Sequence, residues 1–395
     1  MPFSENTPLR IMICAGEVSG DMHATTLMRA LRAHLRVPVI FRGFGGDAMR
    51  AEGAELLYHT DRTAIIGLTP VLRNIFFLLR MRRRMQREII NWRPDLLLTI
   101  DYPGMNLRLA NFAHAHGIKT IHYICPQVWA WHRGRIPKIA KMLDLLLCFF
   151  PFEPALFKST SLRAVFIGHP LVDRAAETHA EAPITLPWQG RYRIALLPGS
   201  RTGEIHHILP RLLKAAALLE KQLANDCSFI IPAPTAKMRI LGETLVAQAR
   251  VKPQHLTFVD NQARQVMLQA HAAAVASGTA TLEASLMLCP TLLVYAASRI
   301  TYLIARRLIT GIRHLGLVNI LAQKEVMPEL LQDAFTPEKV AKQLLLYLTD
   351  TATRDQTLAQ LDATNKLLGN GNASEQAAQT IVAFLYNKLT ATTEA

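Results

Sequence analysis

RIMICAGEVSGDMHATTLMRALRAH, residues 10–34, runs from an apolar segment through a glycine-bearing turn into a helical pattern. A short buried strand, a glycine turn and a helix are how nucleotide-binding α/β domains begin. The stretch therefore predicts an α/β domain near the amino-terminal end of the chain. It also raises the question of whether the turn AGEVSGD, residues 15–21, holds a nucleotide.

The same alternation of apolar runs and helical patterns continues along the chain and restarts once. Continuous apolar strands between amphipathic helices are typical of a parallel sheet covered on both faces. The periodicity is lost at residues 174–190, where prolines collect, and it resumes at YRIALLPGS, residues 192–200. We expect two Rossmann-like doubly wound domains that face a cleft, residues 1–173 and 191–395, joined by a linker at 174–190. The second domain is expected to end in a helical tail beyond about residue 328.

The composition limits the classes of protein and partner. The chain has 395 residues and a formal net charge of +14, which indicates an anionic partner such as nucleic acid, an acidic membrane surface or phosphorylated substrates. No charge-free run of about 18 apolar residues is present, so we expect no transmembrane helix, and MPFSENTPLR has no signal-peptide pattern. The five cysteines share no CxxC spacing and indicate buried thiols in a reducing cytoplasm, without disulfides or a zinc site.

Two glycine-bearing turns in the second half each follow an apolar strand and open a helix. In LPGSRTGEI (197–205) and SGTATLEASL (277–286), the helix-start amides and Arg201 suit a diphosphate, and Glu283 is placed to accept from ribose hydroxyls. Each turn also has a purely structural explanation: Ser200 caps a helix while Arg201 pairs with a carboxylate, and Glu283 completes a capping box. The residues predicted to bind a nucleoside diphosphate are Ser200, Arg201, Ser277, Gly278, Thr279, Thr281 and Glu283.

In the first half, the apolar run DLLLTID (95–101) ends in Asp101. A carboxylate at such a strand end can act as a general base for a hydroxyl nucleophile, although the position is also common for a helix cap. The later segment HYICPQVWAWHRGR (122–135) combines aromatic and basic side chains. Trp129 and Arg133 therefore suit a sugar face and a phosphate, or else form a core tryptophan beside a solvated basic turn.

The segment TPVLRNIFFLLRMRRRMQR (69–87) joins an apolar helical face to a series of arginines. Apolar surface beside arginines is what an interfacial helix on anionic lipid needs. A helix that buries its Leu/Phe face against the sheet explains part of the pattern equally well. A nucleic-acid arm is disfavoured, because no helix-turn-helix, zinc-finger or RNA-binding signature accompanies the segment. The residues predicted to contact a membrane are Leu72, Ile75, Phe76, Leu79, Arg80 and Arg83.

A series of motifs occurs in order between residue 13 and about residue 332: AGEVSGD, GG…EG in GGDAMRAEG, ID.P..N in IDYPGMN, HYICPQVWAW, FPFEP, GHPLVD, LPGSR..EI, SGTATLE and MPELLQ. Together they resemble the lipid-A-disaccharide synthase family of GT-B type glycosyltransferases. The sequence departs from the usual family pattern at Gly104 and Met105, where an acidic and an aromatic residue are common. It departs again near Pro70, where a glutamate is usual, and at Val318, where a proline is usual.

The resemblance implies that a UDP-2,3-diacylglucosamine donor transfers its sugar, with inversion, to 2,3-diacylglucosamine 1-phosphate (lipid X). The products would be the β-1,6-linked lipid A disaccharide 1-phosphate and UDP. It also implies a cytoplasmic protein in peripheral contact with the inner face of the bacterial inner membrane, and it leaves a homodimer open. The second half would hold the nucleotide, so AGEVSGD would lie on the acceptor side of the cleft.

The resemblance also assigns roles to residues. Asp101 is the expected catalytic base, and Glu329 and Gln332 are expected to reach the nucleotide. The expected acceptor-side residues are Glu17, Ser19, Asp21, Trp129 and Arg133. No DxD-like motif is present where a metal ion would bridge the phosphates, so we expect transfer without a metal ion or another cofactor.

Two other classes of protein remain open. One is a GT-B enzyme with a soluble UDP-sugar, such as an epimerase or a peptidoglycan glycosyltransferase, which predicts activity without acyl chains. The other is a basic protein that binds nucleic acid or membrane without catalysis, which predicts salt-sensitive binding and no UDP site.

Overall fold

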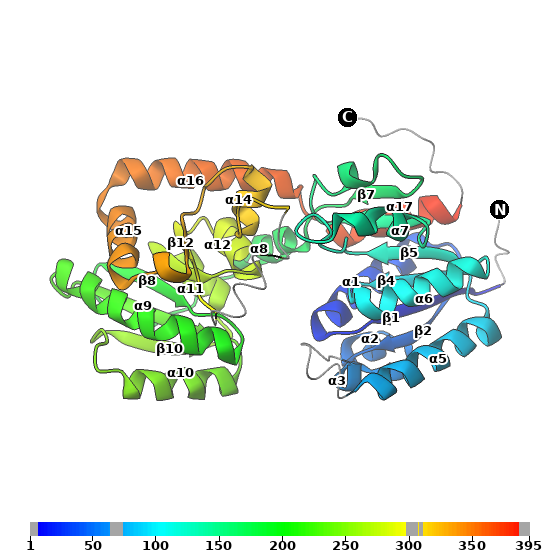
Figure 1. Cartoon of the computed structure of the whole chain (residues 1–395), viewed down its shortest axis with the longest axis horizontal. Coiled ribbons are helices and arrows are strands. Elements are labelled where there is room, and N and C mark those ends of the chain that lie inside the picture. Colours follow the sequence, from blue (N-terminus) through cyan, green and yellow to red (C-terminus); the bar gives the residue numbers. More distant parts are fainter. Residues whose placement is uncertain (1–6, 64–73, 298–306, 308–310, 387–395) are drawn as a thin grey trace. The chain divides into compact units, whose positions relative to one another are not determined.

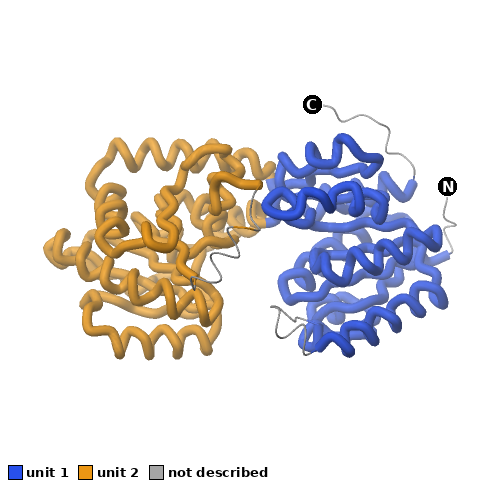
Figure 2. Tube along the Cα trace, viewed as in Figure 1, with its two compact units in different colours: residues 1–170, 371–395 blue, residues 171–370 orange. Residues whose placement is uncertain are grey.

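The computed structural model describes residues 7–63, 74–297, 307 and 311–386. The chain divides into two compact units, which are residues 1–170 with 371–395 (unit 1) and residues 171–370 (unit 2) (Figure 2). Each unit contains one parallel sheet with helices packed on it (Figure 1). The prediction of two Rossmann-like doubly wound units is confirmed.

The sheet of unit 1 has the strand order β3-β2-β1-β4-β5-β6-β7. Its inner strands are uninterrupted apolar runs such as LRIMICA and LLLTI, because both faces of a doubly wound sheet are covered. Its strands are β1 (Leu9–Ala15), β2 (Val39–Gly45), β3 (Glu55–His59), β4 (Leu96–Ile100), β5 (Lys119–Tyr123), β6 (Leu145–Cys148) and β7 (Arg163–Phe166). Its helices are α1 (Val18–His34), α2 (Asp47–Ala51), α3 (Thr60–Thr63), α5 (Ile75–Trp92), α6 (Pro103–Ala115), η1 (Arg133–Arg135), α7 (Ile136–Ala140), η2 (Pro154–Phe157) and α17 (Ala373–Leu385).

The sheet of unit 2 has the strand order β10-β9-β8-β11-β12-β13. Its strands are β8 (Tyr192–Leu197), β9 (Cys227–Ala233), β10 (Leu256–Asp260), β11 (Ala272–Ala276), β12 (Thr291–Tyr295) and β13 (Glu329–Leu331). Its helices are α8 (Pro170–Ala180), α9 (Thr202–Gln222), α10 (Ala236–Gln248), α11 (Ala263–Gln269), α12 (Thr279–Leu286), α14 (Leu317–Ala322), η3 (Gln332–Ala334), α15 (Pro337–Thr349), α16 (Thr351–Asn365) and η4 (Lys366–Leu368).

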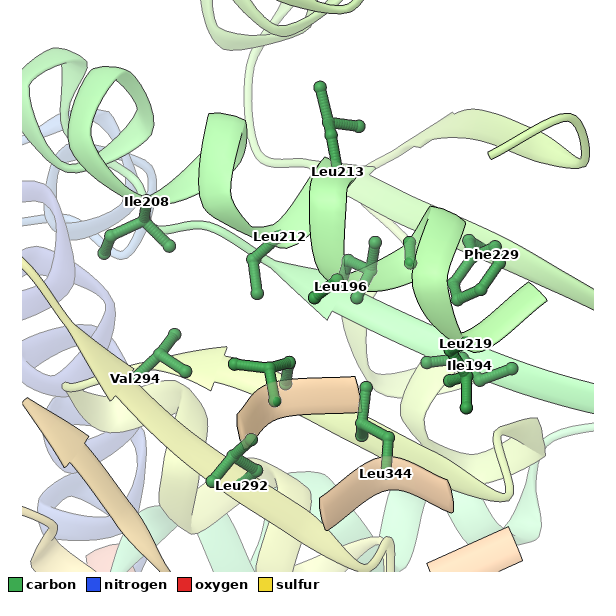
Figure 3. Close-up of a cluster of buried hydrophobic side chains, with 14 of the residues drawn as sticks. Ile194, Leu196, Ile208, Leu212, Leu213, Leu219, Phe229, Leu292, Val294 and Leu344 are labelled. Carbon is green, nitrogen blue, oxygen red and sulfur yellow. The ribbon is translucent and has the colours of Figure 1, made fainter. Parts of the chain in front are cut away.

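The core of unit 2 shows how the helices are held on the sheet. The apolar side of α9, including Ile208, Leu212 and Leu219, packs against Leu196 of β8, and Leu344 of α15 belongs to the same cluster (Figure 3). These side chains are 0 or 1% exposed, and burying each one contributes about 1.5–3 kcal/mol.

Each sheet has one point where the strand order changes direction. In unit 1 the chain leaves β1 for β2 on one side and later returns to β4 on the other side. In unit 2 the same change occurs between β8 and β11. The loops at the carboxyl ends of two such strands run in opposite directions and leave a crevice, where doubly wound folds bind their ligands. These loops contain Glu17 and Asp101 in unit 1, and Ser200 and Gly278 in unit 2.

The boundaries of the units differ from the predicted ones at two places. Residues 170–180 form α8, so part of the expected linker is helical, and His179 Nε2 donates to the carbonyl of Leu286 at 3.1 Å. The predicted second domain includes the end of the chain, but α17 packs along α1 in unit 1. There Ser374 Oγ donates to Thr26 Oγ1 at 3.1 Å, and Lys119 Nζ lies 5.3 Å from the Phe384 ring centroid.

No helix in the described part of the chain is long and apolar enough to cross a membrane.

The packing of α17 makes a prediction for Ile381, which is fully buried in unit 1. We expect Ile381→Ala to destabilise unit 1 by about 2–4 kcal/mol, because it leaves a cavity between α17 and its neighbours. Hydrogen exchange measured by mass spectrometry should then become faster in α1 but not in α15 of unit 2. Gln379→Ala, on the exposed side of the same helix, is the control. Faster exchange in α15 instead would place α17 with unit 2.

Candidate active site

The loop after β4 has an unusual backbone. Asp101 and Tyr102 have φ angles of 45° and 49°, and Ile124, after the neighbouring strand β5, has a φ of 79°. The left-handed region costs a residue with a side chain on the order of 1–2 kcal/mol, and such residues cluster at functional sites. The strained residues lie at the carboxyl edge of the sheet, and two of them, Asp101 and Tyr102, lie at the switch point between β1 and β4.

The side chain of Asn106 in α6 holds this loop. Its Nδ2 lies 2.7 Å from the carbonyl oxygen of Asp101, 3.0 Å from that of Ile100 and 3.1 Å from that of Cys14. The Asp101 N–H in turn donates to the carbonyl of Tyr123 at 2.9 Å. One buried amide therefore ties the ends of β1 and β4 together and fixes the backbone from which the Asp101 carboxylate projects.

The electrostatic environment of Asp101 suits a proton acceptor. Burial raises the pKa of Asp101 above its ordinary value, although a hydrogen bond from the Tyr102 backbone acts to lower it. Burial also raises the pKa of the Tyr102 hydroxyl, and the charge of Glu17 adds to the increase. The phenol donates to the carbonyl of Thr63 at 3.0 Å. The charge of Glu17, in the loop after β1, therefore acts on the residue next to Asp101, in the loop after β4.

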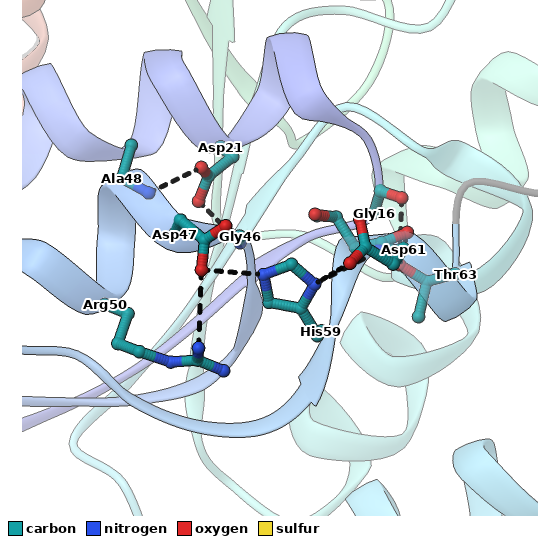
Figure 4. A network of polar contacts seen from close by, with 10 residues as sticks. Gly16, Asp21, Gly46, Asp47, Ala48, Arg50, His59, Asp61 and Thr63 are labelled. Carbon is teal, nitrogen blue, oxygen red and sulfur yellow. Dashed lines mark hydrogen bonds and ion pairs between the residues drawn. The ribbon is translucent and has the colours of Figure 1, made fainter.

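Asp21 has a structural explanation. Its carboxylate accepts from the backbone N–H groups of Gly46 at 2.6 Å, Ala48 at 3.1 Å and Met49 at 3.2 Å, and so caps the start of α2 (Figure 4). A side chain at Gly46 would collide with this carboxylate, which explains the glycine there. We expected Asp21 on the acceptor side, but its oxygens are used within the fold. Of the AGEVSGD turn, Glu17 is partly exposed and Ser19 is exposed.

Trp129 is also part of the core, whereas Arg133 is exposed. The indole Nε1 of Trp129 donates to Glu153 Oε1 at 3.1 Å, and the Phe149 and Phe150 amides donate to Glu153 Oε2 at 3.1 and 3.0 Å. Of the two readings of HYICPQVWAW, the core tryptophan is the one that these contacts support. Burial raises the pKa of Glu153 to about 7, although these hydrogen bonds act to lower it.

Among the described residues, Cys125, Cys148 and Glu153 form the one group with a possible metal-ligand arrangement. Burial raises the pKa of Cys148 well above its ordinary value, and zinc requires the thiolate form. The Glu153 carboxylate already accepts hydrogen bonds on both oxygens. This chemistry does not fit a metal site.

In unit 2, the two predicted phosphate-binding turns differ. At the start of α9, Glu204 Oε2 accepts from the amides of Ser200 and Arg201 at 3.0 and 3.2 Å, and Arg201 donates to Glu204 Oε1 at 2.8 Å. Gly199, with a φ of 110°, leaves room for this carboxylate. Glu204 lies three residues after Arg201, the spacing of a capping box, which is the sequence signal for it.

The start of α12 is open by comparison. No side chain caps it, Gly278 has a φ of 153°, and no atom lies within 4 Å of the position that a Cβ would take there. Ser277 is partly exposed and Thr279 exposed, while the buried Thr281 Oγ1 donates to the carbonyl of Gly278 at 2.8 Å. The uncapped amides of this helix start, together with its dipole, suit an anion better than those of α9.

Glu283 lies one turn into α12 beside two arginines that sequence analysis did not single out. Burial raises the pKa of Glu283, and the charges of Arg264 and Arg174 act to lower it. Arg264 also donates to the carbonyl of Arg174 at 3.3 Å, which links α11 to α8. A half-buried carboxylate next to an open helix start is the arrangement expected for a group that accepts from ribose hydroxyls.

Glu329 and Gln332 make contacts within unit 2. The Glu329 carboxylate accepts from the amides of Leu315 and Gly316, at 2.9 Å for the shortest contact to each, and from Asn319 Nδ2 at 2.8 Å. It thus holds the turn that precedes α14. These partners give the Glu329 carboxylate a role within the fold, while its expected contact with a nucleotide stays a prediction. Gln332 has a φ of 52°, and its side-chain amide pairs with the backbone of Ala297.

Helix α5 has two distinct sides. Met81, Met85 and Ile89 are fully buried against the sheet of unit 1. On the other side Phe76 is 83% exposed, Ile75 is 37% exposed, and Leu79 is partly exposed. The exposed stripe, spaced by four and three residues, consists of Phe76, Arg80, Arg83, Arg87 and Ile90. Leu72 lies outside the described residues.

Two solved structures show the class of fold. The chain superimposes on a UDP-GlcNAc 2-epimerase of Neisseria meningitidis bound to UDP-GlcNAc with a TM-score of 0.56, over 96% of this chain and 100% of that one, at 12% identity. It superimposes on Acinetobacter baumannii MurG with a TM-score of 0.56, over 95% of this chain and 99% of that one, at 13% identity. Two doubly wound units with these neighbours show that the chain has the GT-B fold.

The sequence comparisons identify the family. The model of the lipid-A-disaccharide synthetase family matches residues 11–383. Lipid-A-disaccharide synthase of Geobacter sulfurreducens is 37% identical over 97% of this chain and 99% of its own length. The enzyme of Burkholderia vietnamiensis is 38% identical over 98% of both. The chain belongs to the lipid-A-disaccharide synthetase family of glycosyltransferases, and the resemblance inferred from the motifs is confirmed.

The environment of Glu153 makes a prediction about pH. Its pKa is about 7 in the folded protein against an ordinary value of 4.5, so the folded state holds this proton more tightly than the unfolded chain. The resulting stabilisation is complete below about pH 4.5 and is lost as the pH rises through about 7, with an upper size of about 3 kcal/mol. Glu153→Gln removes this titration.

Urea unfolding of the wild type and Glu153→Gln between pH 5 and 8 tests this prediction. The unfolding free energy of the wild type should fall relative to that of Glu153→Gln as the pH rises. Glu55→Gln, at a side chain that is 60% exposed, is the control and should differ from the wild type by a small and constant amount. A Glu153→Gln difference that is the same at pH 5.5 and pH 8 would contradict the assignment.

Proposed function

We propose that the protein transfers 2,3-diacylglucosamine from its UDP derivative to 2,3-diacylglucosamine 1-phosphate and releases the β-1,6-linked disaccharide 1-phosphate and UDP. Membership of the lipid-A-disaccharide synthetase family supports the reaction. The observation that carries the mechanism is the half-buried carboxylate of Asp101 at the switch point of unit 1. In this proposal unit 1 takes the acceptor and unit 2 takes the donor.

Asp101 is the base in the proposed mechanism. Its raised pKa brings it closer to the pH at which a general base is most effective, since it binds the proton more strongly than an ordinary aspartate. The acceptor 6-hydroxyl attacks the anomeric carbon of the donor while its proton passes to Asp101. One displacement converts an α-linked donor into a β-linked product, so a single carboxylate suffices. Glu17, in the loop after β1, and Ser19, in the first turn of α1, are the remaining acceptor-side candidates, with Arg133 farther along the chain.

The leaving diphosphate needs stabilisation as the bond to the sugar breaks. The uncapped start of α12 offers amides for this charge, and the guanidinium of Arg201, whose side chain is 72% exposed, offers a cation. In other enzymes, removing one hydrogen-bond donor that is placed to meet the charge of the transition state raises the activation free energy by roughly 3–4 kcal/mol. Ser200, Ser277 and Thr279 stand at the same two turns, and Glu283 holds the ribose.

The exposed stripe of α5 supports peripheral contact with an anionic membrane. Phe76 and Ile90 are apolar ends of a row of arginines. Each arginine near an anionic lipid surface contributes about 1 kcal/mol, and the exposed phenyl ring adds apolar contact. Both proposed substrates carry acyl chains, so an enzyme that acts on them has to meet them at the lipid surface.

Asp101→Asn tests the proposed base. The substitution keeps the shape of the side chain and removes its ability to take a proton, so we expect the turnover number to fall about 10²–10⁴-fold with the dissociation constant of UDP unchanged. UDP release from the acylated donor and lipid X in detergent measures it. In the wild type, the rate should fall as the pH is lowered through the raised pKa of Asp101.

Asp95→Asn is the matched control, because Asp95 precedes the same strand β4 at the opposite edge and accepts from the Arg10 amide at 2.8 Å. Turnover that survives Asp101→Asn would move the base elsewhere, with Glu17 the next candidate. Wild-type protein that binds UDP but turns over only soluble UDP-sugars would overturn the proposed substrates.

Glu283→Ala tests the ribose contact. A carboxylate that accepts from both ribose hydroxyls contributes charge-assisted hydrogen bonds, so we expect the UDP dissociation constant to rise about 10–100-fold. The wild type should bind UDP more tightly than 2′-deoxy-UDP, and the variant should lose that preference. Glu338→Ala, on the exposed side of α15, is the control. Equal weakening of both nucleotides would show that Glu283 acts only by positioning Arg264 and Arg174.

A further inference from the structure

The loop after β5 carries an exposed tryptophan. Trp131 is 43% exposed, whereas Trp129, two residues earlier in the same loop, is 5% exposed. Among the described residues, Phe76 and Trp131 are the two aromatic side chains that are exposed. Phe76 belongs to the exposed stripe of α5, which the proposed function assigns to a lipid surface. Trp131 lies instead in a loop at the carboxyl edge of the sheet, the edge at which Asp101 is found.

Trp129 anchors this loop to the sheet. Its Nε1 donates to Glu153 Oε1 at 3.1 Å, and the other carboxylate oxygen of Glu153 accepts from the first two amides after β6. Within the loop, the Trp131 amide donates to the carbonyl of Gln127 at 3.4 Å. The backbone that carries Trp131 is therefore closed into a turn and tied to the carboxyl end of β6.

The conformation of the loop restricts the exposed indole. Residues with a left-handed backbone stand on either side of it, Ile124 with a φ of 79° and His132 with a φ of 60°. Such residues cluster at functional sites. The His132 ring lies beside the indole of Trp131, with the ring centroids 5.1 Å apart and the planes at 53°. Because a neighbouring ring limits the freedom of the indole, less conformational entropy is lost when a ligand covers it.

The loop of Trp131 leaves the sheet next to the loop of Asp101. The Asp101 N–H donates at 2.9 Å to the carbonyl of Tyr123, the last residue of β5. Strand β5 lies between β4 and β6. Neighbouring strands are about 4.8 Å apart, so the carboxyl ends of β4 and β6 are about 10 Å apart. The two loops thus share one short stretch of the edge, where a single substrate can meet both of them.

The chemistry of the loop favours an anionic sugar. A glucosamine ring carries most of its polar groups in equatorial positions, so its faces present C–H groups, which are attracted to the electron-rich face of an aromatic ring. No aspartate or glutamate occurs between residues 124 and 143, while Arg133 and Arg135 follow Trp131 by two and four residues. An indole beside basic side chains suits a sugar that also carries a phosphate.

We propose that the indole of Trp131 stacks on the glucosamine ring of the acceptor and so directs its 6-hydroxyl to Asp101. The inference rests on the proposed function, which places the acceptor in unit 1. We expected Trp129 on the acceptor side, but Trp129 holds the loop and Trp131 makes the sugar contact. Trp131 binds and orients the acceptor, and the proton still passes to Asp101.

Two substitutions separate stacking from simple apolar contact. Trp131→Phe keeps an aromatic face, whereas Trp131→Leu keeps an apolar side chain without one. We expect Trp131→Leu to raise the KM for lipid X about ten-fold and Trp131→Phe to raise it about two- to three-fold, with the KM for the UDP donor unchanged. Trp92→Phe is the matched control, because Trp92 ends α5 just before β4 begins, at the opposite edge of the same sheet.

Tryptophan fluorescence measures the contact without turnover. A covered indole emits at shorter wavelength than an exposed one, so lipid X added to the wild type in detergent micelles should shift the emission to shorter wavelength, relative to micelles alone. The shift should persist in Trp92→Phe and disappear in Trp131→Phe. No shift in the wild type, or an equal shift in Trp131→Phe, overturns the proposal.

Two other results would overturn the proposal by giving Trp131 another partner. An equal shift with phosphatidylglycerol vesicles that contain no lipid X would reassign the indole to the lipid surface. A raised KM for the UDP donor in Trp131→Leu, with a normal KM for lipid X, would reassign it to the donor.

Kinetics also separates this inference from the proposed function. Normal KM values of Trp131→Leu for both substrates would overturn the sugar contact and leave the proposed function standing. A shift with lipid X that depends on Trp131, without any transfer by the wild type, would do the reverse.

Discussion

The hydrogen bonds of the Asn106 side chain are the constraint on which unit 1 depends at its functional edge. A doubly wound sheet separates the loops after β1 and β4, and that separation creates a crevice but leaves its walls without mutual support. Asn106 Nδ2 supplies the support by reaching carbonyls at the ends of both strands and of Asp101 itself. The left-handed backbone of Asp101 and Tyr102 is unfavourable in isolation, and the buried hydrogen bonds of Asn106 to the carbonyls of Ile100 and Asp101 help to offset its cost.

In unit 2 the residues proposed to bind the UDP-sugar also follow strands at the switch point of the sheet. There, the capping of each helix decides whether the amides at its start are available to a ligand. Glu204 already satisfies two amides before α9, whereas nothing caps α12. A diphosphate at α9 would have to replace a carboxylate that is covalently part of the helix, while at α12 it would meet unoccupied donors. The guanidinium of Arg201 is 72% exposed but pairs with Glu204 at 2.8 Å, so α9 contributes a cation only where a diphosphate competes with that carboxylate. The two turns are thus complementary, one as a set of amides and the other as a charge.

The sequence predicts the sheets well, because apolar runs such as AAAVA are unambiguous when both faces are covered. It predicts polar site residues less well. Asp21 and Glu329 occur in motifs of the family and suggest ligands, yet the Asp21 carboxylate caps α2 and the Glu329 carboxylate accepts from amides just before α14. Their partners are backbone amides, which have no sequence signature. Asn106 belongs to the motif ID.P..N, but its partners are carbonyls, and only the fold reveals them. The packing of α17 on α1 could not be predicted from the sequence either, since the pattern of an amphipathic helix shows which face is apolar but not which element covers that face.

The distribution of unpaired cations connects these observations with the net charge of +14. Arginines on α1 and β2 are neutralised by carboxylates within the fold, so they contribute little to the external field. Arg80, Arg83 and Arg87 on α5 form no such ion pair within the described part of the chain. Electrostatic attraction between unlike charges falls within about 10 Å at moderate salt, so this group acts locally. The exposed side of α5 therefore carries part of the excess charge as one local patch, and in the proposed function this patch meets an anionic lipid surface.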